Sequence, residues 1–388
     1  MSHHQRSGAP SWQRLLLGVS AVALLVAGCG SSGGSSGNTS TSGGTLTLGA
    51  TWPLSGQGAA LLKPVTEGAQ IAVDEVNASG GVLGKKFKVD FKDTRLDPQL
   101  SVQTMEQYGS NDVHFVSTSG SAVIPPQLPV AARNKTVVLN QLAQSAKLTG
   151  ASPWLFNFIP ASTAELNDLA KLAVTERGFK KIAILSNNTA LGEGDKAAFT
   201  KAVEGVGGTI ARAETFTASA TDFKTPLLRI QAASPDALYI SGNPDEVALA
   251  TKQVVQMGIK AQLLGRTQNA DPTVLSEAGS AANGMIGVGN IFAPAADNKV
   301  GTDFAAAFTS KYGAKASVYA ALAYDSIKML AQAMKDANSV DPTKVAEKLR
   351  TVKDFPGAMG STTMGDGQTV SYPLYRYQIS NGAVQPLA

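Results

Sequence analysis

Short apolar segments alternate with segments of helical periodicity along most of this chain, and this alternation constrains the fold more than any other feature of the sequence. Residues 46–50 form one such apolar segment, and residues 63–77 carry apolar side chains at helical spacing. The pattern restarts after Pro160. Strands that alternate with helices of about 10–15 residues are typical of parallel sheets covered by helices on both faces. The sequence therefore predicts an α/β fold with doubly wound parallel sheets.

The predicted elements follow one another up to residue 264. Strands are expected at 46–50, 87–91, 113–116, 137–139, 182–185, 209–213, 237–240 and 262–264. Helices are expected at 63–77, 98–108, 128–133, 164–176, 194–206, 223–232 and 246–257. Right-handed crossovers between parallel strands bring the carboxyl ends of the strands to one edge of each sheet.

Length and composition narrow the class of protein. A chain of 388 residues, 43% hydrophobic and 16% charged, suits two or three globular domains and excludes a mostly disordered polymer or a polytopic membrane protein. The net charge is only +4, and no basic run is longer than a doublet. A nucleic-acid groove needs clustered cations to neutralise phosphates. No nucleic-acid partner is expected.

The N-terminus has the features of an export signal. Arg6 and Arg14 precede an apolar run of 13 residues, Leu15–Ala27, which is too short to span a bilayer. The run is followed by Gly28 and by Cys29, the only cysteine of the chain. This pattern resembles a bacterial lipobox, in which the cysteine receives lipid and becomes the new N-terminus. We predict a signal peptide over residues 1–28 and lipidation at Cys29; the alternative is an ordinary secretion signal with an incidental cysteine.

A tether follows the predicted lipidation site. Residues 30–44 contain only Gly, Ser, Thr and one Asn. Such a composition predicts a flexible coil with an average span of roughly 20 Å. Residues 29–44 are therefore expected to hold the folded part at the extracytoplasmic side of the cell membrane, in the periplasm or at the cell exterior, because acyl chains anchor proteins firmly.

Polar loops follow the predicted strands. Open α/β sheets bind ligands just outside the carboxyl ends of their strands. The loops in question are 52–56, 117–121, 140–144, 186–189, 241–243 and 266–269. Apart from Arg266 they are uncharged and rich in hydroxyl and amide groups, which suits a polar ligand held by hydrogen bonds. The alternative is that these residues only form turns and helix caps.

The sequence offers little for catalysis or for metal binding. Outside the predicted signal peptide the only histidine is His114, which stands beside Phe115 and Val116 and is more typical of a packed strand residue. No cysteine other than Cys29 is present, and no catalytic or phosphate-binding motif occurs from Thr45 onward. We expect neither an enzyme nor a cofactor or metal site.

The segment Gly68–Lys86, with its Asn-x-x-Gly-Gly-x-x-Gly stretch at residues 77–84, closely resembles the solute receptors of branched-chain amino acid ABC importers. These are type I periplasmic binding proteins of the leucine/isoleucine/valine class. Further matching positions are Pro53-Leu54-Ser55-Gly56, Asp93, Asp97-Pro98 and Leu191-Gly192-Glu193-Gly194. The resemblance extends from Thr45 to about Gly367.

The resemblance implies two lobes joined by three hinge crossings, near Pro160, Gly289 and Thr369. The first lobe is then residues 45–160 plus 290–369, and the second is 161–289 plus 370–388. Ligand is captured in the cleft as the lobes close about the hinge. The implied partners are a small solute (an amino acid, an organic or aromatic acid, or an amide) and an ABC permease.

The resemblance also implies where ligand binds. In the family a Ser or Thr in the loop after the third strand binds the ligand's carboxylate, and Ser121 matches that position. This loop opens a helix whose free N–H groups favour an anion; the alternative is that Ser121 only caps the helix. The expected ligand-binding residues are Trp52, Ser55, Ser119, Gly120, Ser121, Leu142, Gln144, Leu191, Asn243, Thr267 and Gln268.

The chain departs from the family where the amino-acid receptors surround the ligand's ammonium. The matching positions are Leu61, Leu191, Asn243 and, for the glutamate that pairs with the ammonium, Thr267. A buried ammonium without a carboxylate partner costs several kcal/mol. We therefore expect a carboxylate, an amide or a neutral polar compound with an apolar or aromatic part rather than an ordinary α-amino acid. Trp52 could stack on such a part; the alternative is that this aromatic residue at a strand end packs in the core.

Three functions fit these observations. The resemblance favours a lipid-anchored receptor that delivers a small solute to an ABC importer. The main alternative is a ligand-sensing receptor subunit of the same fold that acts in signalling. The third is an exported enzyme, which turnover of a small substrate would reveal.

Overall fold

The computed structural model describes residues 44–55 and 59–387. The predicted signal peptide, Cys29 and the predicted linker up to residue 43 lie outside the described residues. All described residues belong to one compact unit, Ser42–Ala388.

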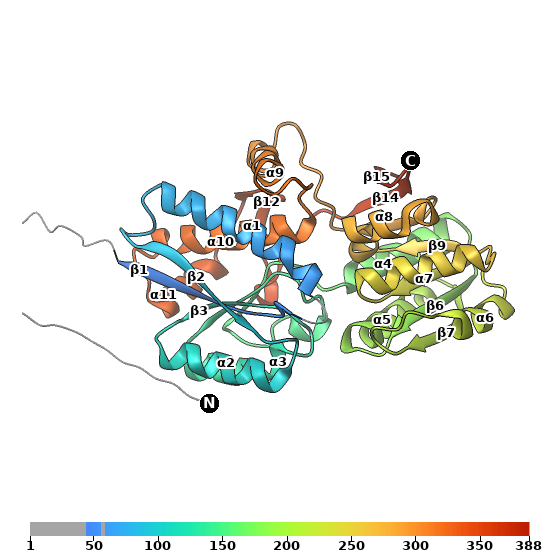
Figure 1. Cartoon of the computed structure of the whole chain (residues 1–388), viewed down its shortest axis with the longest axis horizontal. Helices are drawn as coiled ribbons and strands as arrows, with labels where there is room; N and C mark the ends of the chain where they lie inside the picture. The colour runs from blue at the N-terminus through green and yellow to red at the C-terminus, as the bar shows by residue number, and fades with distance from the viewer. Residues whose placement is uncertain (1–43, 56–58, 388) are drawn as a thin grey trace, which may run out of the picture. The chain divides into compact units, whose positions relative to one another are not determined.

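Five parallel strands form the first sheet, in the order β2-β1-β3-β4-β5 (Figure 1). They are β1 Thr45–Trp52, β2 Lys86–Asp93, β3 Phe115–Thr118, β4 Val137–Asn140 and β5 Leu155–Asn157. The connecting helices are α1 Ala59–Ala78, α2 Pro98–Ser110 and α3 Ile124–Arg133. Successive side chains of a strand point to opposite faces, so Phe115 packs with α1 while Val116 packs with α2 and α3.

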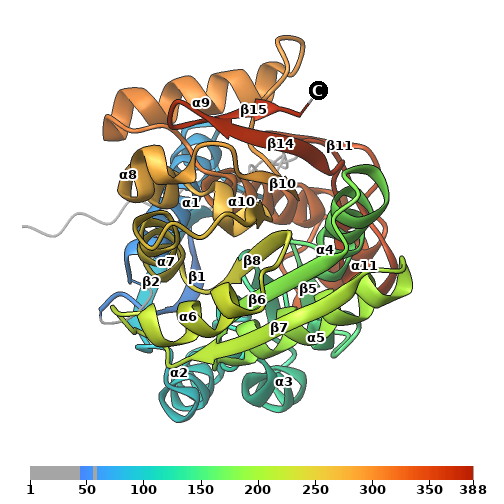
Figure 2. The same cartoon turned by 90° about the vertical axis from the view of Figure 1, so that its right-hand side faces the viewer.

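The second sheet has seven strands, in the order β15-β14-β10-β9-β8-β6-β7 (Figure 2). They are β6 Lys181–Asn187, β7 Thr209–Phe216, β8 Ala237–Ser241, β9 Gln262–Gly265, β10 Ile286–Gly289, β14 Tyr375–Ser380 and β15 Ala383–Pro386. The helices are α4 Thr163–Ala170, α5 Ala190–Gly205, α6 Lys224–Ala232, α7 Pro244–Gln256 and α8 Pro272–Ala278. Helices α4 and α5 cover one face, and α6, α7 and α8 cover the other.

The rest of the chain returns to the first sheet before it ends on the second. Helices α9 Lys299–Tyr312, α10 Val318–Asp336 and α11 Pro342–Arg350 pack in the core of the first sheet. A small antiparallel sheet follows, made of β11 Phe355–Gly357, β12 Gly360–Met364 and β13 Val370–Ser371. We call the first sheet with its helices and this small sheet the first lobe, and the second sheet with its helices the second lobe.

The prediction of an α/β fold with parallel sheets is confirmed, with differences in detail. Strands β14 and β15 run antiparallel to their neighbours, which the sequence analysis did not predict. Helix α3 begins at Ile124 rather than at residue 128, because prolines are accepted in the first turn of a helix, where the missing N–H is not needed. The predicted helix 164–176 is α-helical only to Ala170 and continues as a π-helix over Lys171–Glu176.

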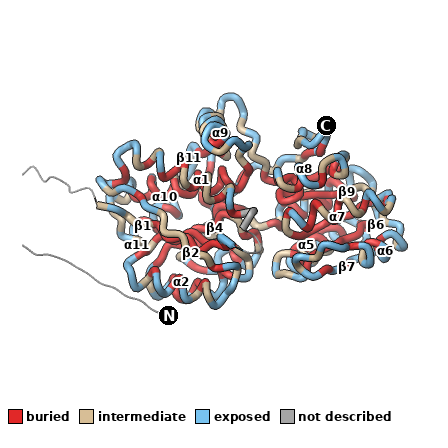
Figure 3. Tube along the Cα trace, in the orientation of Figure 1, coloured by how far each residue is buried: buried red, intermediate tan, exposed pale blue. Residues whose placement is uncertain are grey.

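The cores show where the chain passes between the lobes. Buried residues are concentrated inside each lobe (Figure 3). Val370 and Tyr372, which the sequence analysis placed in the second lobe, pack in the core of the first, whereas Leu374 packs against the second. The chain thus leaves the core of the first lobe after Tyr372 and joins that of the second at Leu374, a few residues beyond Thr369.

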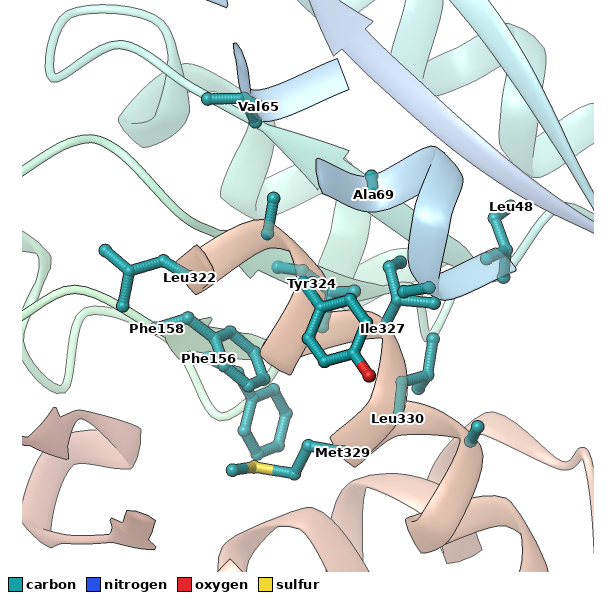
Figure 4. Packing of buried hydrophobic residues seen from close by; sticks show 14 of the residues in the cluster. Leu48, Val65, Ala69, Phe156, Phe158, Leu322, Tyr324, Ile327, Met329 and Leu330 are labelled. Carbon is teal, nitrogen blue, oxygen red and sulfur yellow. The ribbon is translucent and has the colours of Figure 1, made fainter. Parts of the chain in front are cut away.

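Helix α10 is the central element of the first lobe. It is buried on all sides, with 15 of its 19 residues inside the protein. Figure 4 shows its side chains from Leu322 to Leu330 among residues from α1 and β5. Gly68 of α1 permits this packing, because a Cβ at that position would lie 2.1 Å from the carbonyl oxygen of Ala320.

The segment that carries the family resemblance joins α1 to β2. Asn77 Nδ2 donates to Phe87 O (2.8 Å), and Phe87 N donates to Asn77 Oδ1 (2.7 Å). Gly80 and Gly81 have φ of 94° and 80°, a conformation that glycine adopts without strain. This stretch therefore positions an edge strand of the first sheet and takes no direct part in the cavity described next.

Candidate functional site

The loops at the carboxyl ends of the strands enclose a cavity of about 270 Å³ between the two lobes. From the first lobe it is lined by Pro53, Leu62, Leu96, Ser119, Gly120, Ser121, Ala122, Val123, Leu142, Ala143 and Gln144. From the second lobe it is lined by Thr189, Ala190, Leu191, Asn243 and Gln268. The parallel strands of both sheets thus have their carboxyl ends at one space, where open α/β sheets bind ligands.

Eight of the eleven predicted ligand-binding residues line this cavity. They are Ser119, Gly120, Ser121, Leu142, Gln144, Leu191, Asn243 and Gln268. They come from five different loops that are up to 149 residues apart in the sequence, and the fold brings them together because each loop follows a parallel strand.

The other three predicted residues lie elsewhere. Trp52 is 1% exposed and packs in the core, with its ring 5.6 Å from that of Phe91. Ser55 is exposed and donates its hydroxyl to the carboxylate of Asp93. Thr267 is buried; its N–H donates to Glu165 Oε2 (3.1 Å) and its hydroxyl accepts from Asn290 N (2.8 Å). None of the three lines the cavity.

The first-lobe wall offers hydrogen-bond donors. Ser119 is 2% exposed, and its hydroxyl has no hydrogen-bond partner among the described residues. Gly120 has a φ of 105°, and the turn that it makes leads into α3. The N–H groups of Ser121 and Ala122 donate no hydrogen bond to any residue that the structure describes. Free N–H groups at the start of a helix favour an anion or a carbonyl oxygen.

The structure also bears on the alternative role of Ser121. The N-cap position of α3 is Val123, and no side chain caps that helix. The capping role that the sequence left open for Ser121 is therefore absent, and its side chain lies at the cavity.

The second-lobe side of the cavity is formed mainly by residues at the N-termini of helices. Thr189 is the N-cap of α5 and accepts from Gly192 N (3.4 Å), and Asn243 is the N-cap of α7. Glu246 stabilises both loops, because its Oε2 accepts from Asn187 Nδ2 (2.9 Å) and from Asn243 N (2.8 Å). Leu191 adds an apolar surface beside them.

No lining residue of the cavity among those described carries an ionisable side chain. Hydroxyl and amide groups supply all its polar side-chain atoms, and one proline, four leucines, three alanines and one valine supply the apolar surface. His114 lies away from it, half-buried, with Nδ1 3.0 Å from Asn134 O. Within residues 44–55 and 59–387, no cluster of His, Cys, Asp or Glu is arranged to hold a metal ion. The arrangement is suited to hydrogen-bonding a small molecule.

A larger hollow of about 760 Å³ lies between α8, the start of α10 and the strands β14 and β15. Thr267 is the one predicted site residue that lines it. It does not lie at the carboxyl ends of both sheets, so we regard the smaller cavity as the candidate site.

Comparison with known proteins agrees with this geometry. Residues 45–383 match the family described as periplasmic binding protein. The chain is 28% identical over 346 residues to the Leu/Ile/Val-binding protein BraC3 of Rhizobium johnstonii, which covers 86% of this chain and 92% of that protein. The chain belongs to the periplasmic binding protein family. Within that family it is a type I periplasmic binding protein of the branched-chain amino acid class.

Solved structures of the family share the fold. LivJ from Streptococcus pneumoniae, solved in complex with isoleucine, is 24% identical with a TM-score of 0.80, covering 88% of this chain and 98% of that chain. A solute binding protein of an ABC transporter from R. palustris, solved in complex with benzoate, is 20% identical with a TM-score of 0.81, covering 89% and 96%. Among the described residues of this periplasmic binding protein, no helix has the length and apolar character needed to cross a bilayer.

Arg266 lies beneath this site and was not among the predicted ligand-binding residues. It follows β9 and is fully buried. Its Nε donates to Asp195 Oδ2 (2.9 Å) and to Tyr239 Oη (2.9 Å), and its Nη2 forms an ion pair with Asp195 (2.8 Å). A buried guanidinium needs such partners, because an unpaired buried charge is very costly. Arg266 was visible in the sequence as the one charge in a set of neutral loops.

Glu165 on α4 completes the polar cluster around Arg266. Its Oε1 accepts from Gln144 Nε2 (2.7 Å) and Asn290 Nδ2 (2.8 Å), and its Oε2 lies 3.8 Å from Arg266 Nη1. Burial raises the pKa of Glu165, although Arg266 and the hydrogen bonds from Thr267 and Gln144 act in the opposite direction. Neither Arg266 nor Glu165 lines the cavity. Gln144 connects the cluster to the cavity, because it lines the cavity and forms hydrogen bonds with both residues.

Proposed function

We propose that this protein is the extracytoplasmic substrate-binding lipoprotein of an ABC importer, which captures a small polar or carboxylate-bearing solute between its lobes and delivers it to a permease. The observation that carries the proposal is the uncharged, donor-rich cavity formed by loops from both lobes. Membership of a family of solute-binding proteins supports it.

The lining of the cavity favours one class of ligand. The first-lobe wall offers the hydroxyls of Ser119 and Ser121 and free N–H groups at the start of α3, all of which donate to oxygen. No carboxylate among the described lining residues is available to pair with an ammonium, and an unpaired buried ammonium costs several kcal/mol. The ligand is therefore a carboxylate, an amide or a neutral polar compound with an apolar part. The benzoate bound by the R. palustris protein belongs to that class.

Binding is coupled to closure of the lobes. The first lobe (residues 45–160 with 290–372) and the second lobe (residues 161–289 with 374–388) rotate about the three crossings, the last of which lies at residues 372–374. A ligand that touches both walls stabilises the closed form by its differential affinity for the two forms. The protein returns its ligand unchanged and is not an enzyme.

The anchor proposed at Cys29 keeps the receptor near its permease. Two or three acyl chains on this cysteine retain the protein at the extracytoplasmic face of the membrane, because each buried CH₂ contributes about 0.8 kcal/mol. The Gly/Ser-rich composition of residues 30–44 is typical of a linker between such an anchor and a folded part.

A thermal-shift screen tests the proposed function. The library contains amino acids, aromatic acids, amides and polyols. A ligand present at about 100 times its Kd adds about 2.7 kcal/mol to the stability of the folded protein. We expect stabilisation by carboxylates or amides that carry an apolar group. Stabilisation by no compound, or chemical conversion of a compound that does bind, would count against the proposal.

A further inference from the structure

Two glutamines from opposite lobes share one guanidinium at the base of the cavity. Arg266 Nη1 donates to Gln144 Oε1 (2.6 Å), and Arg266 Nη2 donates to Gln268 Oε1 (2.5 Å). Gln144 follows β4 of the first lobe, and Gln268 follows β9 of the second. Both side chains line the cavity, whereas Arg266 itself is fully buried and does not.

This contact determines the orientation of both amides. A guanidinium only donates hydrogen bonds, so each glutamine must turn its oxygen toward Arg266 and its NH₂ group away. The two NH₂ groups then differ in their hydrogen-bond partners. Gln144 Nε2 donates to Pro160 O (3.2 Å) and to Glu165 Oε1 (2.7 Å), so its hydrogens are used within the protein. Gln268 Nε2 donates to no residue that the structure describes.

Both the backbone and the side chain of Arg266 form buried hydrogen bonds. Its carbonyl oxygen accepts from Tyr377 Oη (2.8 Å), and its N–H donates to Asn269 Oδ1 (2.9 Å). Asp195, which pairs with the guanidinium, also accepts from Ser241 Oγ (2.7 Å). The guanidinium therefore cannot rotate to release the two glutamine oxygens without breaking several buried hydrogen bonds.

We propose that Arg266 is a positioning residue: by holding the oxygen of the Gln268 amide, it determines that the second-lobe side of the cavity presents a hydrogen-bond donor rather than an acceptor. By orienting Gln268 it presents an NH₂ group to the cavity, so that this wall selects a ligand with an acceptor atom facing it. Ser119, Ser121 and the start of α3 present donors from the first lobe. The ligand class is thus narrowed to compounds that carry acceptors toward both lobes, and a ligand ammonium is rejected. The proposal rests on the proposed function, because it assigns selectivity to the same cavity.

The orientation of the amides can be tested without any ligand. The experiment is NMR of the side-chain amides in the full chain, with the Gln144 and Gln268 signals assigned from variants that lack each residue. We expect the Gln268 NH₂ hydrogens to exchange with solvent at least about tenfold faster than those of Gln144, because only the latter are hydrogen-bonded. Protection of the Gln268 NH₂ group equal to that of Gln144 would overturn the proposal.

The selectivity is tested with three probes of matched shape: benzoate, benzamide and benzylamine. Gln268→Glu keeps an acceptor for Arg266 but replaces the donor that faces the cavity with a second oxygen. We expect benzoate affinity to fall about 10- to 100-fold and benzylamine affinity to rise, measured by calorimetry. Gln107→Glu makes the same chemical change at an exposed position on α2, away from the cavity, and should leave the three affinities unchanged.

Arg266→Lys tests the positioning role directly. A lysine ammonium is a point donor and cannot replace the planar fork that holds both glutamine oxygens. We expect the preference for benzoate over benzylamine to shrink in this variant, whereas a purely structural role would lower stability and leave the order of the three affinities unchanged. An unchanged order in both Gln268→Glu and Arg266→Lys would overturn the proposal. A wild-type protein that binds no compound at all would instead contradict the proposed function, and the NMR experiment would still test the orientation of the amides.

Discussion

The hydroxyl of Ser119 allows ligand binding to be separated from folding stability. It is buried at the cavity and has no hydrogen-bond partner among the described residues, so no protein group satisfies it. An unsatisfied buried polar group costs about 1–3 kcal/mol. Ser119→Ala should therefore leave the free energy of unfolding unchanged or raise it by about 1 kcal/mol in the absence of ligand.

The same substitution should weaken binding. In the complex, the hydroxyl donates to the ligand's carboxylate, and a hydrogen bond to a charged group contributes about 1.5–3 kcal/mol. This corresponds to about a 10- to 100-fold increase in the Kd for benzoate or for the best carboxylate found by screening. Stability and affinity thus change in opposite directions, as expected where a binding site keeps an unfavourable group for its function.

Urea denaturation without ligand and calorimetry with ligand measure the two effects. Ser186→Ala is the matched control, because the Ser186 hydroxyl in β6 is also buried and without a partner among the described residues but does not line the cavity. The control should show the stability change alone. A Ser119→Ala protein that is clearly destabilised and retains its affinity would refute the reasoning, since the hydroxyl would then be structural.

Four further predictions follow from particular residues. Ser121→Ala should weaken carboxylate binding by about 1–3 kcal/mol in calorimetry, and unchanged affinity would remove this residue from the site. Burial raises the pKa of Asp325 to about 7 in the folded protein, from 3.8, so its contribution to stability is full below about pH 4 and is lost as the pH rises through about 7. Urea unfolding should therefore show a loss of about 3 kcal/mol between pH 5 and pH 8 that Asp325→Asn lacks, and equal pH profiles would contradict this. Gly68→Ala should destabilise the protein by about 1–3 kcal/mol, because its Cβ would collide with a backbone carbonyl of α10, whereas Gly194→Ala, with no atom nearby, should not lower the thermal midpoint. Cys29→Ser should release the protein from the membrane in cell fractionation, and continued retention would refute the anchor.

Local patterns in the sequence were sufficient to predict which loops lie at the ligand-binding edge of each sheet. A parallel strand that is buried on both faces appears as a short apolar run, and the loop after it must lie at the ligand-binding edge of the sheet. That loops as distant as 119–121 and 243 meet across a cleft was implied by the family resemblance, with its two lobes. The prediction needed no knowledge of side-chain contacts.

Two features of this site were beyond the sequence: the direction in which a particular side chain points, and hydrogen bonds between residues far apart in the chain. Trp52 ends β1, and the pleat of that strand decides whether its ring faces the core or the edge. Thr267 and Gln268 lie in a 3₁₀ turn, Thr267–Ala270, in which successive side chains point in different directions, so that one lines the cavity and the other does not. Arg266 acts through partners 71 and 122 residues away, and no local pattern predicts such pairs.

Small-angle X-ray scattering of the purified protein, with and without the best ligand from the screen, tests the central claim most directly. If the cavity between the lobes holds a solute by closing on it, the radius of gyration should fall on saturation with ligand, and it should fall less for Ser119→Ala at the same ligand concentration. A ligand that binds with calorimetric heat but leaves the scattering curve unchanged would contradict the account.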